Sequence, residues 1–239
     1  IDPHVFPNQN YVIKGTFGGS STMDASATAR PTTSVGATLL TGTSSADRTT
    51  LIPRTAVELP GGVPSSAWSA IKFGTENQVI YNTVIITDSS VADMDFQAGL
   101  KLSSTALSYV TDDNQAMFFY ATHDDIGALT TNANLHFIYS VAGTDYITDL
   151  GIVVAANTVY RLRIEIDSSR KISVFVNNVQ HGLVTSATAG GATQLVSTTK
   201  SLTMTDDIDL IPTISVGTKT TSSKKIHVGN IKISRNFFE

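Results

Sequence analysis

Glu165 and Asp167 are the pair of side chains whose spacing comes nearest to acid–base chemistry. Alternate residues of a strand point to one face, so both carboxylates would reach the same surface if this segment is extended. Retaining glycoside hydrolysis needs two carboxyl groups about 5 to 5.5 Å apart. Arg161 and Arg163 share the same alternation, however, and indicate a solvated strand whose charges complement one another. We therefore expect no glycoside hydrolysis from this pair.

Other reactive constellations are missing from the sequence. There is no cysteine, nucleophile elbow, P-loop or glycine motif for dinucleotides. Two acidic stretches, 111–114 and 206–209, could offer oxygen atoms to calcium, but neither has the spacing of a defined calcium loop. We expect no catalytic residue, no metal and no cofactor. The histidines lack the spacings of zinc sites and are expected mostly at the surface: His4, His123, His136, His181 and His227.

The composition favours a β protein that binds neither nucleic acid nor membrane. Charged residues make up 15% of the 239 residues, whereas serine and threonine make up about a quarter. The net charge is -4 and no basic block occurs, which argues against nucleic acid as a partner. The N-terminal residues do not resemble a signal peptide, and the most apolar runs have the length of strands rather than of membrane-spanning helices.

The chain divides into an expected arm and an expected domain. Residues 18–50 are almost entirely small or hydroxyl-bearing and offer little surface to a core. We predict an extended N-terminal arm and linker over 1–64 and a β-sandwich over 65–239. The apolar residues of the arm would contact a neighbouring molecule or, alternatively, form a local strand on their own sandwich: Phe6, Tyr11, Val12, Ile13 and Phe17.

From residue 65 onward the apolar residues recur with a period of two. Between Met94 and Leu102 the alternation predicts a strand with one buried face and one wet face, and 160–167 shows the same pattern. Phe118 and Tyr120 share a parity that favours the second sheet over solvent. Shorter strands are expected over 79–87, 116–122, 135–141, 145–150 and 171–177.

Two local features refine this interpretation. Asn177 and Asn178 tolerate positive φ and predict a tight turn after the hairpin strand 171–177. The buried parity changes between Val228 and Ile231, which predicts a bulge at 229–230. Short strands separated by turns, with hardly any helical periodicity, predict an all-β fold, an antiparallel two-sheet sandwich or jelly roll.

The segment 158–180 resembles the penultimate hairpin of concanavalin A-like lectin/glucanase jelly rolls, in which a strand reading YRLRIEID precedes one reading FYINGV. The segments 209–217 and 226–235 fit the same family. Glucanases of this family place catalytic carboxylates in a Glu-hydrophobic-Asp-hydrophobic-Glu pattern, and here the third position is Ser169. The resemblance therefore implies the fold without the hydrolytic set. A further departure is Asn178, where the family commonly has glycine.

More narrowly, the segments 53–62, 72–78 and 98–102, together with Trp68, are similar to structural proteins of tailed double-stranded DNA phages. This resemblance implies a non-enzymatic virion protein, foremost a capsid decoration or cement protein at the particle surface. Its partners would be the major capsid protein or other virion proteins, and a homo-oligomer, with a trimer favoured, would suit capsid symmetry. The alternative is a receptor-binding fibre or spike module that recognises host-surface polysaccharide, which fold analogy permits. A polysaccharide-degrading enzyme would need residues outside the strand 160–167.

Overall fold

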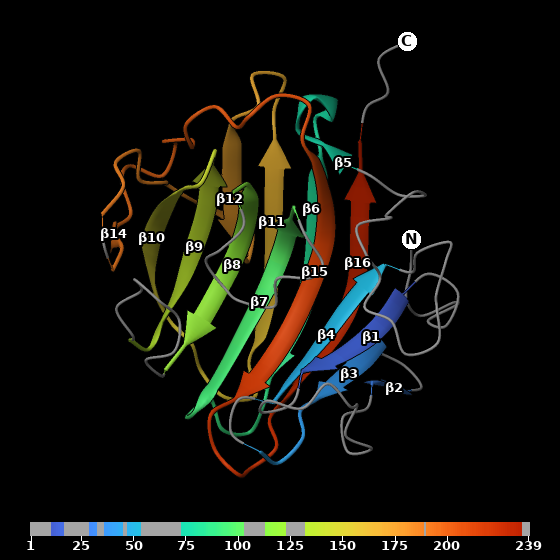
Figure 1. Ribbon diagram of the computed structural model, residues 1–239. Coiled ribbons are helices and arrows are strands. Elements are labelled where there is room, and N and C mark those ends of the chain that lie inside the picture. The colour runs from blue at the N-terminus through green and yellow to red at the C-terminus, as the bar shows by residue number, and fades with distance from the viewer. Residues whose placement is uncertain are drawn as a thin grey trace.

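Two β-sheets packed face to face form the structure, which is a computed structural model (Figure 1). It describes residues 11–16, 29–32, 36–44, 47–53, 73–102, 113–122, 132–188 and 190–235. Most neighbouring strands run antiparallel, and the exception is the short parallel pair β10–β14. The predicted all-β two-sheet sandwich is therefore confirmed.

Among the described residues, one sheet has nine strands and the other has seven. Neighbouring strands of the first are β1 (Tyr11–Thr16), β4 (Arg48–Pro53), β15 (Asp209–Thr218), β7 (Met94–Lys101), β8 (Gln115–Ala121), β9 (Asn134–Val141), β10 (Thr144–Val153) and β14 (Ala192–Thr193), with β5 (Phe73–Gly74) pairing with β15. The second runs β13 (Val179–His181), β12 (Ile172–Val176), β11 (Val159–Ile166), β6 (Ile80–Thr87), β16 (Lys225–Ser234), β3 (Gly36–Leu40) and β2 (Ala29–Thr32).

Helix is a minor component of the described chain. It is represented there by one 3-10 turn, η1 (Thr75–Asn77), which follows β5. Within the same residues, no helix has the length and apolar character needed to cross a membrane.

The core lies between the inner faces of the two sheets and is rich in aromatic rings. Phe96 stacks on Tyr120 with ring centroids 5.4 Å apart, and Phe118 meets Phe137 edge-on at 5.1 Å. Phe118 and Tyr120 therefore face the second sheet, as their parity predicts. Each large apolar side chain buried in this way contributes about 1.5–3 kcal/mol.

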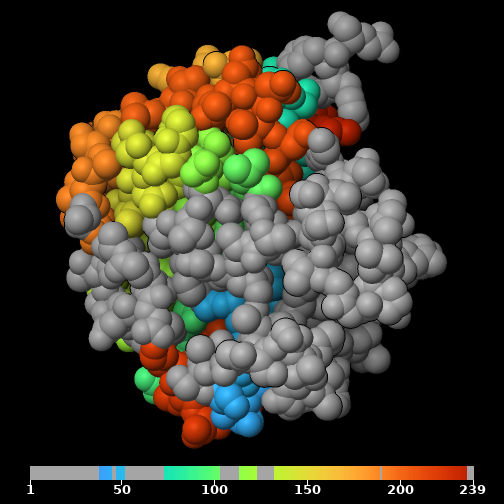
Figure 2. All heavy atoms as spheres, in the orientation of Figure 1, coloured from blue at the N-terminus to red at the C-terminus, as the bar shows by residue number. Residues whose placement is uncertain are grey.

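The long connection between β13 and β15 is bonded to the nine-stranded sheet at several points, and one of them is a buried tyrosine. Tyr139 Oη donates to the carbonyl of Val184 at 2.7 Å and accepts from the backbone N–H of Leu202 at 3.2 Å. In the space-filling view this connection, coloured orange, lies directly against the yellow-green strands at one end of the sandwich (Figure 2). The end that carries β13 and β14 is therefore closed by an ordered segment.

The two predicted local features of the seven-stranded sheet are present. Asn177 and Asn178 have φ angles of 51° and 68°, so both adopt the left-handed conformation that a tight hairpin between β12 and β13 requires. The pairing of β16 with β6 shifts register between Val228 and Ile231, which is the predicted bulge. A Cβ on Gly229 would lie only 3.0 Å from that of Val84, so glycine allows β16 to approach β6 there.

Strands from the first 53 residues lie at the opposite side of the sandwich, in blue in Figure 1. β1 pairs with β4 and is the terminal strand of the nine-stranded sheet, whereas β2 pairs with β3 and ends the seven-stranded sheet. Leu39 of β3 and Leu51 of β4 belong to the core and are fully or nearly fully buried. The predicted boundary at 64–65 lies outside the described residues.

Candidate functional site

On the outer face of the nine-stranded sheet, several polar side chains are almost entirely buried, beside a small apolar cluster of Phe119, Ala121, Ile138 and Ile147. The alternation in β7 predicts that Asp95, Gln97 and Lys101 face water. Each of these three residues, however, is only 1% exposed. That expectation is wrong, because period-two patterning tells which side chains share a face but not whether the face meets water. The inner residues of β7 are buried as predicted.

An ion pair lies within this polar face. Arg48 of β4 and Asp95 of β7 approach to 2.9 Å across β15, and Arg48 Nη1 also donates to Ser215 Oγ at 3.2 Å. Burial lowers the pKa of the Arg48 guanidinium, and the charge and hydrogen bond of Asp95 oppose that shift. Two charges removed from water are tolerated only when each satisfies the other, so the two residues form one structural unit.

A second polar group occupies β9 and β10 on the same face. His136 Nε2 lies 3.9 Å from Asp149 Oδ2, and burial lowers the pKa of His136 despite that carboxylate. For Asp149, burial acts to raise the pKa, but hydrogen bonds from Asn134, the Gly151 N–H and Asn132, together with His136, hold the pKa below its ordinary value. The carboxylate is therefore held charged beside an imidazole that favours its neutral form.

Several buried polar atoms of this face have no hydrogen-bond partner in the structure. They include both amide atoms of Gln97 and Oε1 of Gln115. An unsatisfied buried polar group costs about 1–3 kcal/mol, so such atoms are usually avoided in a face that serves stability alone. These residues make the nine-stranded face the first candidate site, although the chain itself already covers them and leaves them closed to a partner.

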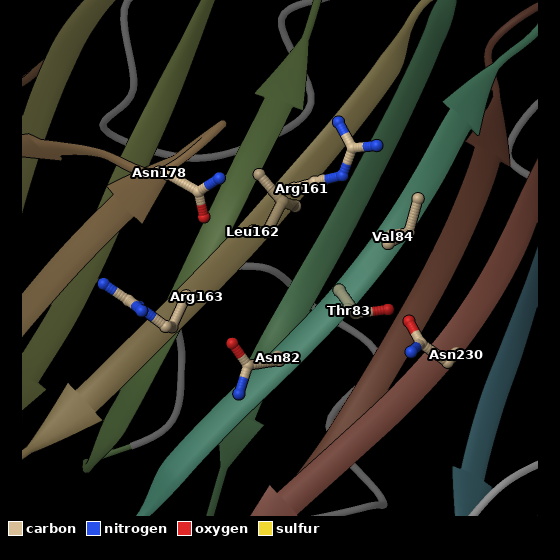
Figure 3. Close-up of a pocket in the computed structure, with 8 residues that line it drawn as sticks. All are labelled: Asn82, Thr83, Val84, Arg161, Leu162, Arg163, Asn178 and Asn230. Carbon is tan, nitrogen blue, oxygen red and sulfur yellow. The ribbon is translucent and has the colours of Figure 1, made fainter.

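The second candidate is a shallow depression of about 120 Å³ on the outer face of the seven-stranded sheet (Figure 3). β6 contributes Asn82, β11 contributes Arg161 and Arg163, the turn after β12 contributes Asn178 and the bulge of β16 contributes Asn230. The remaining lining residues are Thr83, Val84 and Leu162. We refer to this site as the arginine–asparagine depression.

The two arginines of the depression are held differently. The Arg163 guanidinium lies 3.8 Å from the centroid of the Phe175 ring, and its Nε is 3.2 Å from Glu165. Arg161 is exposed, and its side chain forms no hydrogen bond or ion pair with the described residues. One guanidinium is thus held in place while the other is free to bind.

The two carboxylates considered for acid–base chemistry have separate roles. Glu165 lies on the outer face beside Arg163, whereas Asp167 follows the end of β11 and accepts from Lys200 Nζ at 2.7 Å. Burial acts to raise the pKa of Asp167, but the Lys200 hydrogen bond and the N–H groups of Lys171 and Ser169 lower it below its ordinary value. Asp167 therefore stabilises the β11–β12 turn.

The predicted contact residues of the N-terminal segment fall partly outside the described residues. Phe6 and Phe17 are outside them. Tyr11, Val12 and Ile13 belong to β1, where their backbones pair with Pro53, Ile52 and Leu51 of β4. These three residues therefore lie in a local strand on the chain's own sandwich, which was the alternative expectation for them.

The other candidates from the sequence do not assemble into a site. In the described part of the chain, no group of three or more His, Asp or Glu side chains is placed to hold a metal ion. Of the acidic stretch 206–209, Asp206 pairs with Arg170 at 3.0 Å. His136 and His181 are buried, against the expectation of surface histidines, and His181 Nδ1 is bonded to Gln194 Oε1.

Sequence reasoning missed both candidate surfaces as sites. Asn82 and Asn230 are far apart in the sequence and meet only because β6 pairs with β16. The bulge, which the sequence does predict, is what places Asn230 beside the depression. On the other sheet, the polar residues at alternate positions of β7 were visible in the sequence, but their burial was not.

Comparison with solved structures shows which proteins share this sandwich. The carbohydrate recognition domain of Emp46p in its metal-free form is 8% identical with a TM-score of 0.56, over 99% of this chain and 93% of that chain. That of Emp47p is 6% identical with a TM-score of 0.57, over 99% and 94%. The alginate lyase from Corynebacterium sp. is 9% identical with a TM-score of 0.55, over 96% of each chain.

No protein-family model matches the sequence, and no curated protein sequence matches it. At such low identity the structural matches establish the fold alone. The chain therefore has the concanavalin A-like lectin/glucanase jelly-roll fold, as its penultimate hairpin indicated. That fold occurs in both carbohydrate recognition domains and in a lyase. The fold alone therefore does not decide whether this chain binds a ligand or catalyses a reaction.

Proposed function

We propose that this chain is a non-enzymatic structural protein of a tailed-phage particle, a capsid decoration protein that acts by protein–protein contact at the particle surface. The observation that carries the proposal is the position of the N-terminal strands. β1 and β2 come from the first 32 residues and end the two sheets at the same side of the sandwich. The phage-like segments 53–62, 72–78 and 98–102 support the same assignment.

A terminal strand is where a second chain can continue a sheet, because its outer row of backbone N–H and C=O groups is available for pairing. The two terminal strands differ in this respect. β2 contains Pro31, which has no N–H to donate, whereas β1 contains no proline. We infer that β1 is the edge that meets the major capsid protein or another virion protein. A homo-oligomer, with a trimer favoured, would suit the symmetry of a capsid.

Deletion of residues 1–32 tests this function. It removes β1 and β2 but retains β3 and β4, which carry the buried Leu39 and Leu51. The truncated protein should fold, with a cooperative thermal transition, and should be lost from particles assembled in infected cells. A matched variant that replaces Lys171, an exposed turn residue, with glutamine should be incorporated normally. Normal incorporation of the folded truncation would contradict the proposal.

Glycan recognition is the second candidate function, in the form of a receptor-binding fibre or spike module for host-surface polysaccharide. It is favoured by the arginine–asparagine depression and by the shared fold with two carbohydrate recognition domains. In this case the free protein should bind host polysaccharide saturably and should reduce phage adsorption. Adsorption that is unchanged by a saturating excess of the folded protein would contradict this function.

A further inference from the structure

We propose that the arginine–asparagine depression binds an anionic saccharide. Arg161 would hold its carboxylate or sulfate group, while Asn82, Asn178 and Asn230 would bind its hydroxyl groups (Figure 3). This inference rests on the second of the proposed functions, glycan recognition, and names the site and the class of ligand.

The depression gathers hydrogen-bonding groups whose capacity the fold leaves unused. Within the described part of the chain, the Arg161 guanidinium and the side-chain amides of Asn82, Asn178 and Asn230 form no hydrogen bond. A guanidinium offers a fork of N–H donors that matches the two oxygens of a carboxylate or sulfate. A carboxamide both donates and accepts, as a sugar hydroxyl does, so three of them beside one arginine suit a charged sugar.

The framework of the depression is rigid. β6, β11 and β16 are interior strands of the seven-stranded sheet, and each pairs with a neighbour on both sides. Asn178 is fixed in a tight turn, and Arg163 is held against Phe175 and Glu165. Groups that are already positioned lose less conformational entropy on binding. Arg163, already paired with Glu165, therefore forms part of the fixed wall, while Arg161 is the side chain that would contact the ligand.

Charge and size restrict the ligand further. The strands β6, β11, β12 and β16 together carry four lysine or arginine residues and one glutamate, although the whole chain has a net charge of -4. Lys232 extends this positive region, because it lies opposite Asn82 in the register of β16 and β6. The depression has a volume of about 120 Å³ and is open on its outer side. It can therefore seat one anionic group, while the rest of a saccharide would extend beyond it.

The test is a titration of the untruncated 239-residue chain, monitored by calorimetry and by NMR of the side-chain amide signals. The probes are oligomers of galacturonate, of sulfated galactose and of neutral galactose. We expect at least one anionic oligomer to bind at least tenfold more tightly than the neutral one and to shift the amide signals of Asn82, Asn178 and Asn230. The two anionic arms distinguish a carboxylate from a sulfate as the recognised group.

Two charge-matched variants locate the binding. Arg161→Gln should weaken binding of the anionic oligomer at least tenfold, whereas Lys171→Gln, which removes one positive charge at the other end of the β11–β12 hairpin, should change it less than twofold. Both residues are exposed, and unchanged backbone spectra would confirm that both variants fold. Equal binding by Arg161→Gln and the wild type would overturn the depression as the site.

The remaining outcomes separate the site from the function. Saturable binding of a glycan that leaves the three amide signals unmoved would overturn the depression but leave glycan recognition standing. Absence of binding by all three oligomers would overturn the depression as a site for an anionic saccharide, while the adsorption experiment would still decide glycan recognition. Binding of a glutamate hexapeptide that depends on Arg161, without binding of any oligosaccharide, would assign the depression to a protein partner and overturn the saccharide.

Discussion

The two outer faces of this sandwich use the same kinds of side chain under opposite conditions. On the nine-stranded sheet, Arg48 and Asp95 form an ion pair that is almost wholly withdrawn from water. On the seven-stranded sheet, Arg163 and Glu165 form a pair in which each side chain keeps about a third of its surface exposed. An arginine–carboxylate pair therefore has no fixed energetic value, because its surroundings decide how much each partner depends on the other.

The two outer faces also differ in how polar atoms without a hydrogen-bond partner affect the stability of the fold. The amide of Gln97 is buried without a partner and lowers the stability of the fold, whereas the amide of Asn82 is half-buried beside a depression and can exchange bonds with water. An additional hydrogen bond to the Gln97 amide would remove this loss of stability. The Asn82 amide, by contrast, destabilises the fold little without a partner, so it suits reversible binding.

The largest expected difference between the faces concerns their ion pairs. Asp95→Ala removes the carboxylate that pairs with the buried Arg48 guanidinium, so the free energy of unfolding should fall by about 3–5 kcal/mol. Glu165→Ala removes the corresponding carboxylate from the exposed pair and should cost about 0–1 kcal/mol. Urea unfolding monitored by circular dichroism measures both values.

A double variant separates the charge from the packing. Arg48→Met combined with Asp95→Leu removes both charges and should recover most of the stability that Asp95→Ala loses. If Asp95→Ala and Glu165→Ala destabilise the protein equally, the difference between the faces does not exist in solution.

The comparison also shows how far the sequence could predict this molecule. Alternation in 160–167 and the parity of Phe118 and Tyr120 indicated the correct inner faces, because a strand's geometry is local. The turn at Asn177 and Asn178 was predictable for the same reason, since a φ above zero suits few residue types.

Properties that depend on pairing between strands far apart in the sequence could not be predicted from the sequence. Arg48 reaches Asp95 because β15 lies between β4 and β7. The depression requires β6 to lie between β11 and β16, which brings Asn82 near Asn230. Neither arrangement leaves a local pattern. Burial of the outer residues of β7 is likewise a property of the folded chain, and the polar composition of that face argued against it.

The second difference concerns the unpartnered amides. Gln97→Leu replaces two unsatisfied buried polar atoms with apolar ones of similar size, so the free energy of unfolding should rise by about 1–2 kcal/mol. Asn82→Leu, on the other face, should change it by less than about 0.5 kcal/mol, because that amide is already partly hydrated. Chemical unfolding at neutral pH measures the two variants side by side. A loss of stability in Gln97→Leu would show that the amide makes a bond in solution, and it would narrow the contrast between the faces.

The smallest expected difference lies in the histidines, of which His136 is on the nine-stranded face and His227 on the other. Burial lowers the pKa of both below the ordinary value, and Lys225 adds to the shift of His227. Because the unfolded histidine takes up a proton near pH 6.5 and the folded one resists it, stability is fully present above that pH. It declines as the pH falls, by up to about 1.4 kcal/mol per pH unit for each histidine.

His136 is 1% exposed, whereas His227 is only partly buried and bonds Thr38 through Nδ1 at 2.7 Å. His136→Gln should therefore remove more of the decline between pH 7.5 and 5.5 than His227→Gln does, and the difference should be about 1 kcal/mol at the lower pH. Urea unfolding at three pH values measures these slopes. An equal effect of the two substitutions would mean that both imidazoles reach water equally well, and that the burial of the nine-stranded face is not maintained in solution.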